Sequence, residues 1–320
     1  MNTRNAAFLF LWIFLFMGVF ARFIASPHPI IIYDKKQRVD LPRFPMIHSI
    51  FNNDLKSAKT DYRQLAQRSE IGAIFTLIPY SPYENDLANY LNPPSAGRFG
   101  HYLGTDETGR DVAARLVHGT TNSMMVSIVA VGIALLIGIL IGTMAGYFGG
   151  WVDIAISRFI EVVICFPKLI LIIAVLALRK PTIWNLMLVI GLTSWTDMAR
   201  LIRGEVFKIK NYDYVQATRA MGAGHFRIMF WHILPGTIGP LSVTAAFDVA
   251  GAVLTESGLS FLGIGVPLPE PSWGDVLKTA QDFPDLAWWM TLFPGLLIFM
   301  TIITFNNLGE RLRRRFARES

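Results

Sequence analysis

The sequence DYVQATRAMGAGHFRIMFWHILP, residues 213–235, is a basic and amphipathic segment between two apolar runs of membrane length. Residues 212–221 favour a helix, and the run Gly222-Ala223-Gly224 is expected to end it because glycine readily adopts a left-handed C-cap. A second helix then begins at His225, and Pro235 is expected to end it because proline lacks a backbone donor. The apolar stripe of this second helix consists of Phe226, Met229, Phe230 and Ile233.

Such a helix–turn–helix is expected to lie on the membrane surface, with one apolar face and one basic face. Two uses fit this pattern equally well. The segment can present a docking surface to a soluble partner, or it can be an interfacial segment that contacts only lipid headgroups.

The composition indicates an integral membrane protein. Of the 320 residues, 52% are hydrophobic and 16% are charged, whereas soluble proteins carry roughly 25% charged residues. The net charge is +6, but the basic residues cluster beside apolar runs, which favours membrane orientation over nucleic-acid binding. Cys165 is the single cysteine, so the chain can form no internal disulfide and no cysteine-based metal site.

The apolar runs predict an all-α integral membrane protein with six transmembrane helices, since a span needs roughly 20 apolar residues. The runs are 6–25, 122–147, 156–178, 183–202, 237–257 and 287–307. The first run could instead be a cleaved signal peptide. The predicted organisation is a first transmembrane helix (1–25), an extracytoplasmic segment (26–121), a five-helix core (122–310) and a basic cytoplasmic tail (311–320).

Lysine and arginine predict that both termini are cytoplasmic. They concentrate in 1–6, 148–158, 200–236 and 308–320, whereas the opposite short loops, 179–182 and 258–286, hold only Arg179, Lys180 and Lys278. The long segment 26–121 mixes prolines, tyrosines and both charge signs. Connections of this length usually carry structure or function, so we expect a small extracytoplasmic cap, with a flexible tether as the alternative.

Three motifs resemble a known family. The pattern Gln216-Ala217-Thr218, Gly222, His232 and Leu234-Pro235 is similar to the EAA loop of ABC importer permeases. The resemblance implies that 206–235 is a coupling loop that docks on an ATPase subunit, through these residues and Ala223. Gln216 and Thr218 stand where the family commonly has glutamate and alanine. Glutamine loses the charge of glutamate, so an ion pair made by that glutamate is not expected here.

The other two motifs resemble the C-type permease of dipeptide, oligopeptide and nickel importers. They are HYLGTDETGRD, residues 101–111, and LSFLGIGV, residues 259–266, followed by PSWG at 271–274. Around Asp106, Gly104 and Gly109 are expected to form turns, with Arg110 and Asp111 capping the approach to the second span. Residues 259–274 are interpreted as an outer gate or as a packed loop, with Phe261, Gly263, Gly265 and Trp273 as its candidate residues.

Two ionisable residues are predicted deep in the membrane, where charges are costly and often functional. Lys168 lies about 18 Å and Asp248 about 16 Å from the inner ends of their spans, at about 1.5 Å per residue. They could form a structural ion pair, or one of them could line the pathway and meet a peptide terminus, or each could have another partner. Glu161, one turn from Arg158, is expected to form a local helix pair with it.

The resemblance implies a permease subunit of an ATP-driven importer in the bacterial inner membrane, carrying di- or oligopeptides or peptide-like compounds. It implies a second permease subunit, two ATPase subunits and an extracytoplasmic solute-binding protein as partners, with nickel or glutathione as alternative substrates. The chain lacks a G-x-x-x-x-G-K-[ST] phosphate loop, so ATP and Mg are expected on the ATPases and no cofactor on this chain. An intramembrane hydrolase lacks G-x-S-x-G, and a stand-alone secondary transporter is expected to show paired half-repeats, which the sequence lacks.

Overall fold

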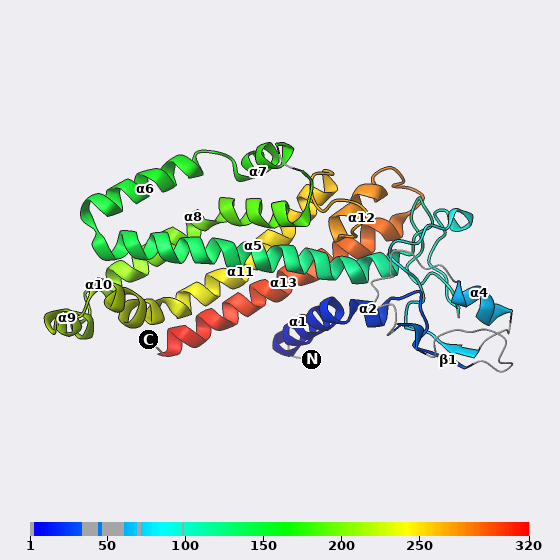
Figure 1. The fold of residues 1–320 in the computed structure, drawn as a ribbon, viewed down its shortest axis with the longest axis horizontal. Coiled ribbons are helices and arrows are strands. Elements are labelled where there is room, and N and C mark those ends of the chain that lie inside the picture. Colours follow the sequence, from blue (N-terminus) through cyan, green and yellow to red (C-terminus); the bar gives the residue numbers. More distant parts are fainter. Residues whose placement is uncertain are drawn as a thin grey trace. The chain divides into compact units, whose positions relative to one another are not determined.

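The protein is mostly helical in a computed structural model, which describes residues 3–33, 44–46, 61–68, 72–97, 99–178 and 180–319 (Figure 1). The longer helices are α1 (Thr3–Val19), α5 (Val112–Phe148), α6 (Gly150–Ile164), α7 (Lys168–Ala177), α8 (Ile183–Ile209), α11 (Leu234–Phe261) and α13 (Trp288–Glu319). The shorter ones are α2 (Ala21–Ile24), α4 (Tyr62–Gln67), η2 (Leu87–Asn89), α9 (Asp213–Ala220), α10 (His225–Arg227), η3 (Ile228–Ile233) and α12 (Trp273–Ala280).

The chain forms two compact units. Unit 1 comprises Met1–Phe8, Met125–Thr255 and Thr301–Ser320, and unit 2 comprises Leu9–Met124 and Glu256–Met300. Within unit 2, β1 (Ile31–Tyr33) pairs antiparallel with β2 (Gly72–Ile74), and Ile32 lies opposite Ala73. Both residues are buried against Tyr62 and Ala66 of α4. The described parts of 26–121 therefore contain this sheet, α4, η2 and the start of α5, and residues 34–43, 47–60, 69–71 and 98 lie outside the described residues.

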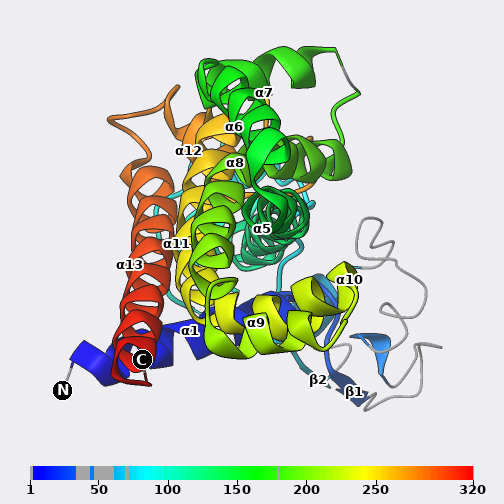
Figure 2. The ribbon, with the colours of Figure 1, turned by 90° about the vertical axis from the view of Figure 1, so that its left-hand side faces the viewer.

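Unit 1 is organised around close packing of α5 against α8, which lie side by side in Figures 1 and 2. Three glycines spaced four residues apart, Gly138, Gly142 and Gly146, form the contact face of α5. A Cβ atom added at Gly142 would lie 2.5 Å from the carbonyl oxygen of Ala199 and 2.9 Å from Cβ of Ile202. Small residues at such spacing let two membrane helices approach to backbone contact.

The predicted third span, 156–178, is not one continuous helix. The chain breaks between α6 and α7, whose axes meet at 78°. Pro167 lies at the break with an extended ψ of 120°, and proline disfavours helical geometry in the residue before it. The sequence interpretation treated the whole run as straight because its hydropathy is continuous across the proline.

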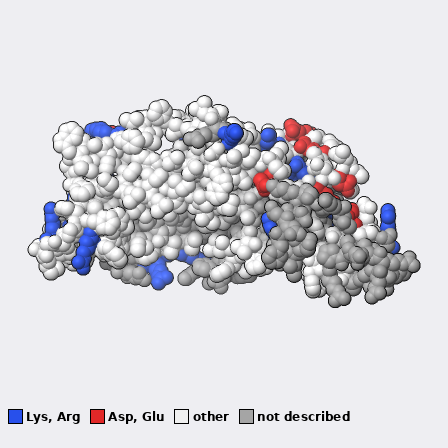
Figure 3. Space-filling model, viewed as in Figure 1, with Lys and Arg blue, Asp and Glu red and all other residues white. Residues whose placement is uncertain are grey.

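Three helices of the described residues are long and apolar enough to cross a membrane, and the bent pair α6–α7 would make four. The three are Val112–Phe148, His225–Phe261 and Trp288–Phe316. In unit 1, Figure 3 shows few charged side chains along the long helices and a concentration of lysine and arginine at the end that holds α9. This distribution is the one expected for a multi-pass membrane protein.

Candidate functional site

The predicted coupling loop, residues 206–235, begins with the helix that the sequence predicts. Helix α9 covers Asp213–Ala220, and Gly222 follows with a φ of +82°. This conformation is left-handed, so the expected glycine C-cap is confirmed. A Cβ atom at Gly222 would meet nothing within 4 Å, so the requirement for glycine comes from the backbone and not from crowding.

The predicted end of the second helix at Pro235 is wrong. Helix α10 continues through η3, a π-helix over Ile228–Ile233, directly into α11, which contains Pro235 near its start. A proline within a helix removes one backbone hydrogen bond and crowds the preceding turn. The turn immediately before Pro235 is a wide π turn, in which the backbone N–H of Leu234 donates to the carbonyl of Met229, five residues earlier.

The π-helix also changes which side chains face the core. Ile228 and Ile233, five residues apart, are completely buried and Met229 nearly so, whereas Phe226, the first residue of the predicted apolar stripe, is 67% exposed. A π-helix places residues i and i+5 on one face, whereas the prediction assumed the spacing of an α-helix. Of the predicted apolar stripe, Met229 and Ile233 therefore pack in the protein interior, while Phe226 lies on the surface.

The residues of the predicted coupling motif lie together on and around α9, at the end of unit 1 seen in Figure 2. Gln216 and Ala217 are exposed and Thr218 is half-buried. The Gln216 amide donates to the carbonyl of Lys210 (3.1 Å), and the Thr218 hydroxyl donates to that of Tyr214 (2.7 Å). Ala223 and Leu234 are half-buried, and the carbonyl of His232 accepts a hydrogen bond from the Tyr214 hydroxyl (3.2 Å). The outer face of α9 is thus exposed.

The loop is bonded to the end of α5. The Lys210 ammonium donates to the carbonyl of Gly146 (2.7 Å), and the Tyr147 hydroxyl is 2.8 Å from Nδ1 of His225. Burial lowers the pKa of Lys210, and nearby Asp153 partly opposes that shift. Asp153 itself accepts two hydrogen bonds from the Arg203 guanidinium of α8, one of them 2.7 Å long.

In unit 2, the motif 101–111 folds around a buried carboxylate. Asp106 is fully buried and accepts hydrogen bonds from Arg110 (2.7 Å) and from Arg115. Arg115 also donates to Asp275 of α12, so it links the motif to the outer loop. Burial opposes ionisation of Asp106, but the two guanidiniums outweigh it and hold the pKa of Asp106 below its usual value. The sequence analysis missed Arg115 and Asp275, which no local pattern connects.

The predicted turns and cap of this motif are present. Gly104 and Gly109 have φ values of +77° and +75°, and a Cβ atom at Gly109 would lie 1.7 Å from the Asp86 carbonyl oxygen. The Asp111 carboxylate accepts from the backbone N–H of Ala114 (2.7 Å), which caps the start of α5. Its other oxygen lies 2.8 Å from Nδ1 of His101.

The outer-loop candidates differ in burial. Trp273 is completely buried and its indole donates to the carbonyl of Leu116 (3.2 Å), whereas Phe261 is 38% exposed. Gly263 has a φ of +79°, and a Cβ at Gly265 would overlap Ser260. Glu256, which the sequence analysis did not single out, is fully buried and accepts from the Ser260 hydroxyl (2.8 Å). The Ser260 hydroxyl in turn accepts from the backbone N–H of Val266 (3.1 Å), which holds the loop against the end of α11. The gate and the packed loop both stay predictions.

The two intramembrane charges lie in unit 1. Lys168 is exposed at the start of α7, and Asp248 is half-buried in α11. They lie within electrostatic range of each other, and Asp197 of α8 is also within range of Asp248. In the part of the chain that the structure describes, Lys168 and Asp248 form no ion pair within 4.0 Å. Their pairing stays a prediction. Arg158 and Glu161 do form the expected local pair, at 2.6 Å.

Comparison with known proteins identifies the family. Residues 138–318 match the family described as binding-protein-dependent transport system inner membrane component. The dipeptide transport system permease protein DppC of Bacillus subtilis is 39% identical over 240 residues, covering 74% of this chain and 73% of that protein. This chain belongs to that permease family.

Two further members of the permease family are named for dipeptide and for glutathione transport. The dipeptide permease DppC of Alkalihalophilus pseudofirmus is 37% identical over 243 residues, covering 75% of this chain and 79% of that protein. The glutathione transport system permease GsiD of Pectobacterium atrosepticum is 36% identical over 244 residues, with coverages of 74% and 78%. The fold is similar to that of a chain of the MetNI methionine ABC transporter in an inward-facing form, with a TM-score of 0.52 and 17% identity. That match covers 62% of this chain and 95% of the other.

The family match covers the coupling loop, Lys168 and Asp248, but not the motif 101–111. In this permease, α9 and the residues whose hydrogen bonds join it to α5 therefore lie within the matched region.

Proposed function

We propose that this chain is one permease subunit of an ATP-driven importer of short peptides. The observation that carries the proposal is the match to peptide permeases at 37–39% identity over about three quarters of the chain. The glutathione permease matches almost as well. Because glutathione is itself a tripeptide, a small peptide with charged ends is the chemistry shared by these cargoes.

The proposed topology has six spans, formed by α1, α5, α6–α7, α8, α11 and α13, with both termini in the cytoplasm. Lysine and arginine support this orientation, since they gather at the α9 end of unit 1 (Figure 3) and in the tail of α13. Unit 2 includes the segment 26–121 and the outer loop. The proposed topology assigns both to the extracytoplasmic side, where a solute-binding protein would deliver cargo.

Coupling is proposed to run through α9. Val215 of α9 packs with Ile202, Val206 and Ile209 of α8 and with Ile228 and Ile233 of η3 in one buried cluster. The hydrogen bonds between Lys210 and Gly146 and between Tyr147 and His225 add to this cluster. Together these contacts hold α9 firmly against the ends of α5 and α8. A force on the exposed face of α9 would thus move the membrane helices, because packed interiors transmit displacement.

In this mechanism the ATPase partners bind ATP and Mg and perform the hydrolysis. Their closure moves α9 as a lever, and the spans alternately expose a central cavity to each side of the membrane. A second permease subunit completes the pathway. This chain contributes binding, orientation and movement, and no covalent step.

The test is co-expression with the genomically neighbouring ATPase and binding protein, followed by purification through a tag on this chain. We expect the ATPase to co-purify with wild type and to be lost with Gly222→Asp, which alters the turn beside α9. Gly224→Asp is the matched control, because Gly224 has a φ of −66° at the N-cap of α10, a position that favours aspartate.

ATP-driven uptake of a dipeptide into proteoliposomes would complete the assignment. Uptake by this chain alone, driven by an ion gradient and with no ATPase partner, would contradict the proposal. A stand-alone secondary transporter would then be the function.

A further inference from the structure

In unit 1, one face of α8 and one face of α11 each carry a row of residues at intervals of three or four positions, most of them charged or small. On α8 the face contains Asp197, Leu201, Glu205 and Lys208, and on α11 it contains Gly236, Pro240, Thr244 and Asp248. Residues three to four positions apart lie on the same side of a helix. The two faces are opposed, because six of these eight residues line one cavity, and the remaining two, Asp197 and Asp248, lie within electrostatic range of each other.

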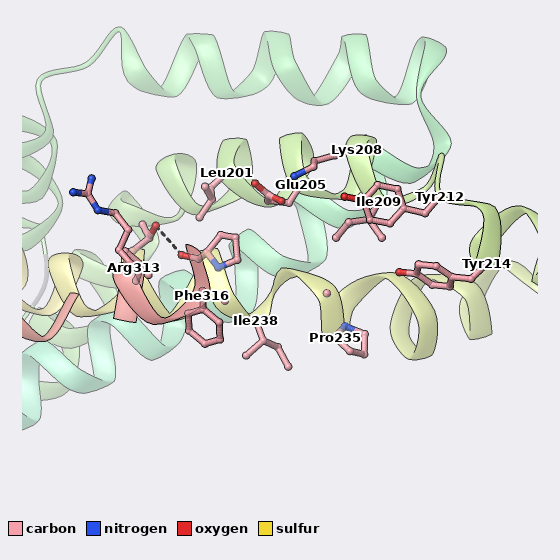
Figure 4. A pocket seen from close by; sticks show the side chains of 15 residues that line it. Leu201, Glu205, Lys208, Ile209, Tyr212, Tyr214, Pro235, Ile238, Arg313 and Phe316 are labelled. Carbon is pink, nitrogen blue, oxygen red and sulfur yellow. Dashed lines mark hydrogen bonds between the residues drawn. The ribbon is translucent and has the colours of Figure 1, made fainter. Parts of the chain in front are cut away.

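The cavity has a volume of about 770 Å³ and lies between α8, the start of α11 and the end of α13 (Figure 4). Its walls combine apolar side chains with Glu205, Lys208, Arg313 and the two tyrosines Tyr212 and Tyr214. Figure 4 shows Glu205 and Lys208 projecting from neighbouring turns of α8. The combination of apolar wall and a few charged groups is typical of sites for small molecules.

The charges in this cavity are only partly paired. Glu205 is half-buried and Lys208 exposed, and among the described residues neither forms an ion pair within 4.0 Å. Arg313 is bonded to Glu310 of its own helix at 2.9 Å. Glu205 and Lys208 therefore present one negative and one positive group, a single helical turn apart, to whatever occupies the cavity.

We infer that this cavity binds a short peptide with free ends, with Glu205 facing the peptide's ammonium group and Lys208 its carboxylate. The inference rests on the proposed function and names the substrate chemistry of its inner site. Three residues of helix rise about 4.5 Å, and the ends of an extended dipeptide are at most about 7 Å apart. Two side chains that diverge from the helix can span that separation.

The same helix faces continue into the membrane. Asp197 lies eleven residues before Lys208 on α8, roughly 16 Å along the axis. At that depth, Asp197 and Lys168 both lie within electrostatic range of Asp248. Positive and negative groups therefore occur together there, as they do in the cavity. A peptide leaving this deeper group would next meet Glu205 and Lys208, which places the cavity on the cytoplasmic half of the route.

The experiment measures peptide binding to the permease–ATPase complex in nanodiscs without the solute-binding protein, by ligand-observed NMR. The probes are alanyl-alanine, its N-acetyl derivative and its C-terminal amide. We expect Glu205→Gln to raise the dissociation constant of alanyl-alanine about 5- to 10-fold, as for a partly exposed charged hydrogen bond, and to leave that of the N-acetyl derivative unchanged. Lys208→Gln should show the same pattern with the amide.

Glu161→Gln is the matched control, because Glu161 is an exposed glutamate of α6 that does not line the cavity. The inference is wrong if wild type binds capped and free peptides equally, or if Glu205→Gln and Lys208→Gln match the control. The inference is also wrong if Lys208→Gln leaves peptide binding unchanged but lowers the amount of anionic phospholipid that co-purifies with the complex. The cavity would then be a lipid-binding site. If the wild-type importer takes up peptide, the proposed function holds even when one of these three results overturns the inference about the cavity.

Discussion

The contact between α5 and α8 gives a quantitative test of the fold. Replacing Gly142 by alanine adds a Cβ atom 2.5 Å from the Ala199 carbonyl oxygen and 2.9 Å from Cβ of Ile202. Comfortable carbon contacts are about 3.5–4.0 Å, so the helices must separate by roughly 1 Å. Overpacking of this kind costs about 1–3 kcal/mol, while alanine in place of glycine returns up to about 1 kcal/mol of helix propensity.

Gly132→Ala isolates the packing contribution, because Gly132 is in the same helix and a Cβ atom there would meet nothing within 4 Å. The propensity gain is common to both variants, so their difference should equal the packing cost, about 1–3 kcal/mol. The assay is unfolding of the purified complex in detergent, by temperature and by SDS titration. If Gly142→Ala proves as stable as Gly132→Ala, α5 and α8 do not meet at these glycines and the argument fails.

Three further outcomes follow from the buried and membrane charges. Arg115→Met should cost about 3–5 kcal/mol of stability, because Asp106 and Asp275 both lose their buried partner; a loss below about 1 kcal/mol in a thermal melt would contradict the network. The pKa of Asp106 is lower in the folded protein than its ordinary 3.8, so its stabilisation is complete above about pH 5 and is lost as pH falls through the folded value. The melting-temperature gap between wild type and Asp106→Asn should therefore be constant at neutral pH and shrink below about pH 4. Lys168→Met should leave folded yield near that of wild type, since Lys168 is exposed, and should lower peptide uptake; a fall in yield that Asp248→Leu reverses would instead establish the pair.

Local sequence patterns predicted the local structure well. The helix over 212–221, the left-handed Gly222 and the cap at Asp111 are each set by a few neighbouring residues, and each is present. The pair of Arg158 and Glu161 belongs to the same class. Gly138, Gly142 and Gly146 also carried a readable signal, small residues four apart in an apolar helix, which the sequence analysis did not use.

The wrong predictions arose from structural features that a hydropathy pattern does not record. The phase of a π-helix cannot be read from α-helical spacing, so the predicted apolar stripe began at the exposed Phe226 and omitted the completely buried Ile228. The bend at Pro167 does not interrupt the apolar run, so α6 and α7 were joined. Arg115 and Asp275 are 160 positions apart, and only the three-dimensional fold brings them together.

The packing of α9 suits the coupling role proposed for it in a way that the sequence motif alone does not reveal. In the proposed mechanism, α9 must be rigid where it meets the membrane helices and accessible where it meets its partner. The stiff side of α9 is Val215, buried with Ile202 and Ile233 in one cluster, while its other face exposes Gln216 and Ala217. The rigid connection extends to α11 as well. Helix α10 runs through the π-helix η3 into α11 without interruption, and Pro235 lies within this continuous helix. A displacement of α9 would then be transmitted directly to α11. The face of α11 that bears Thr244 and Asp248 lies along the proposed peptide route.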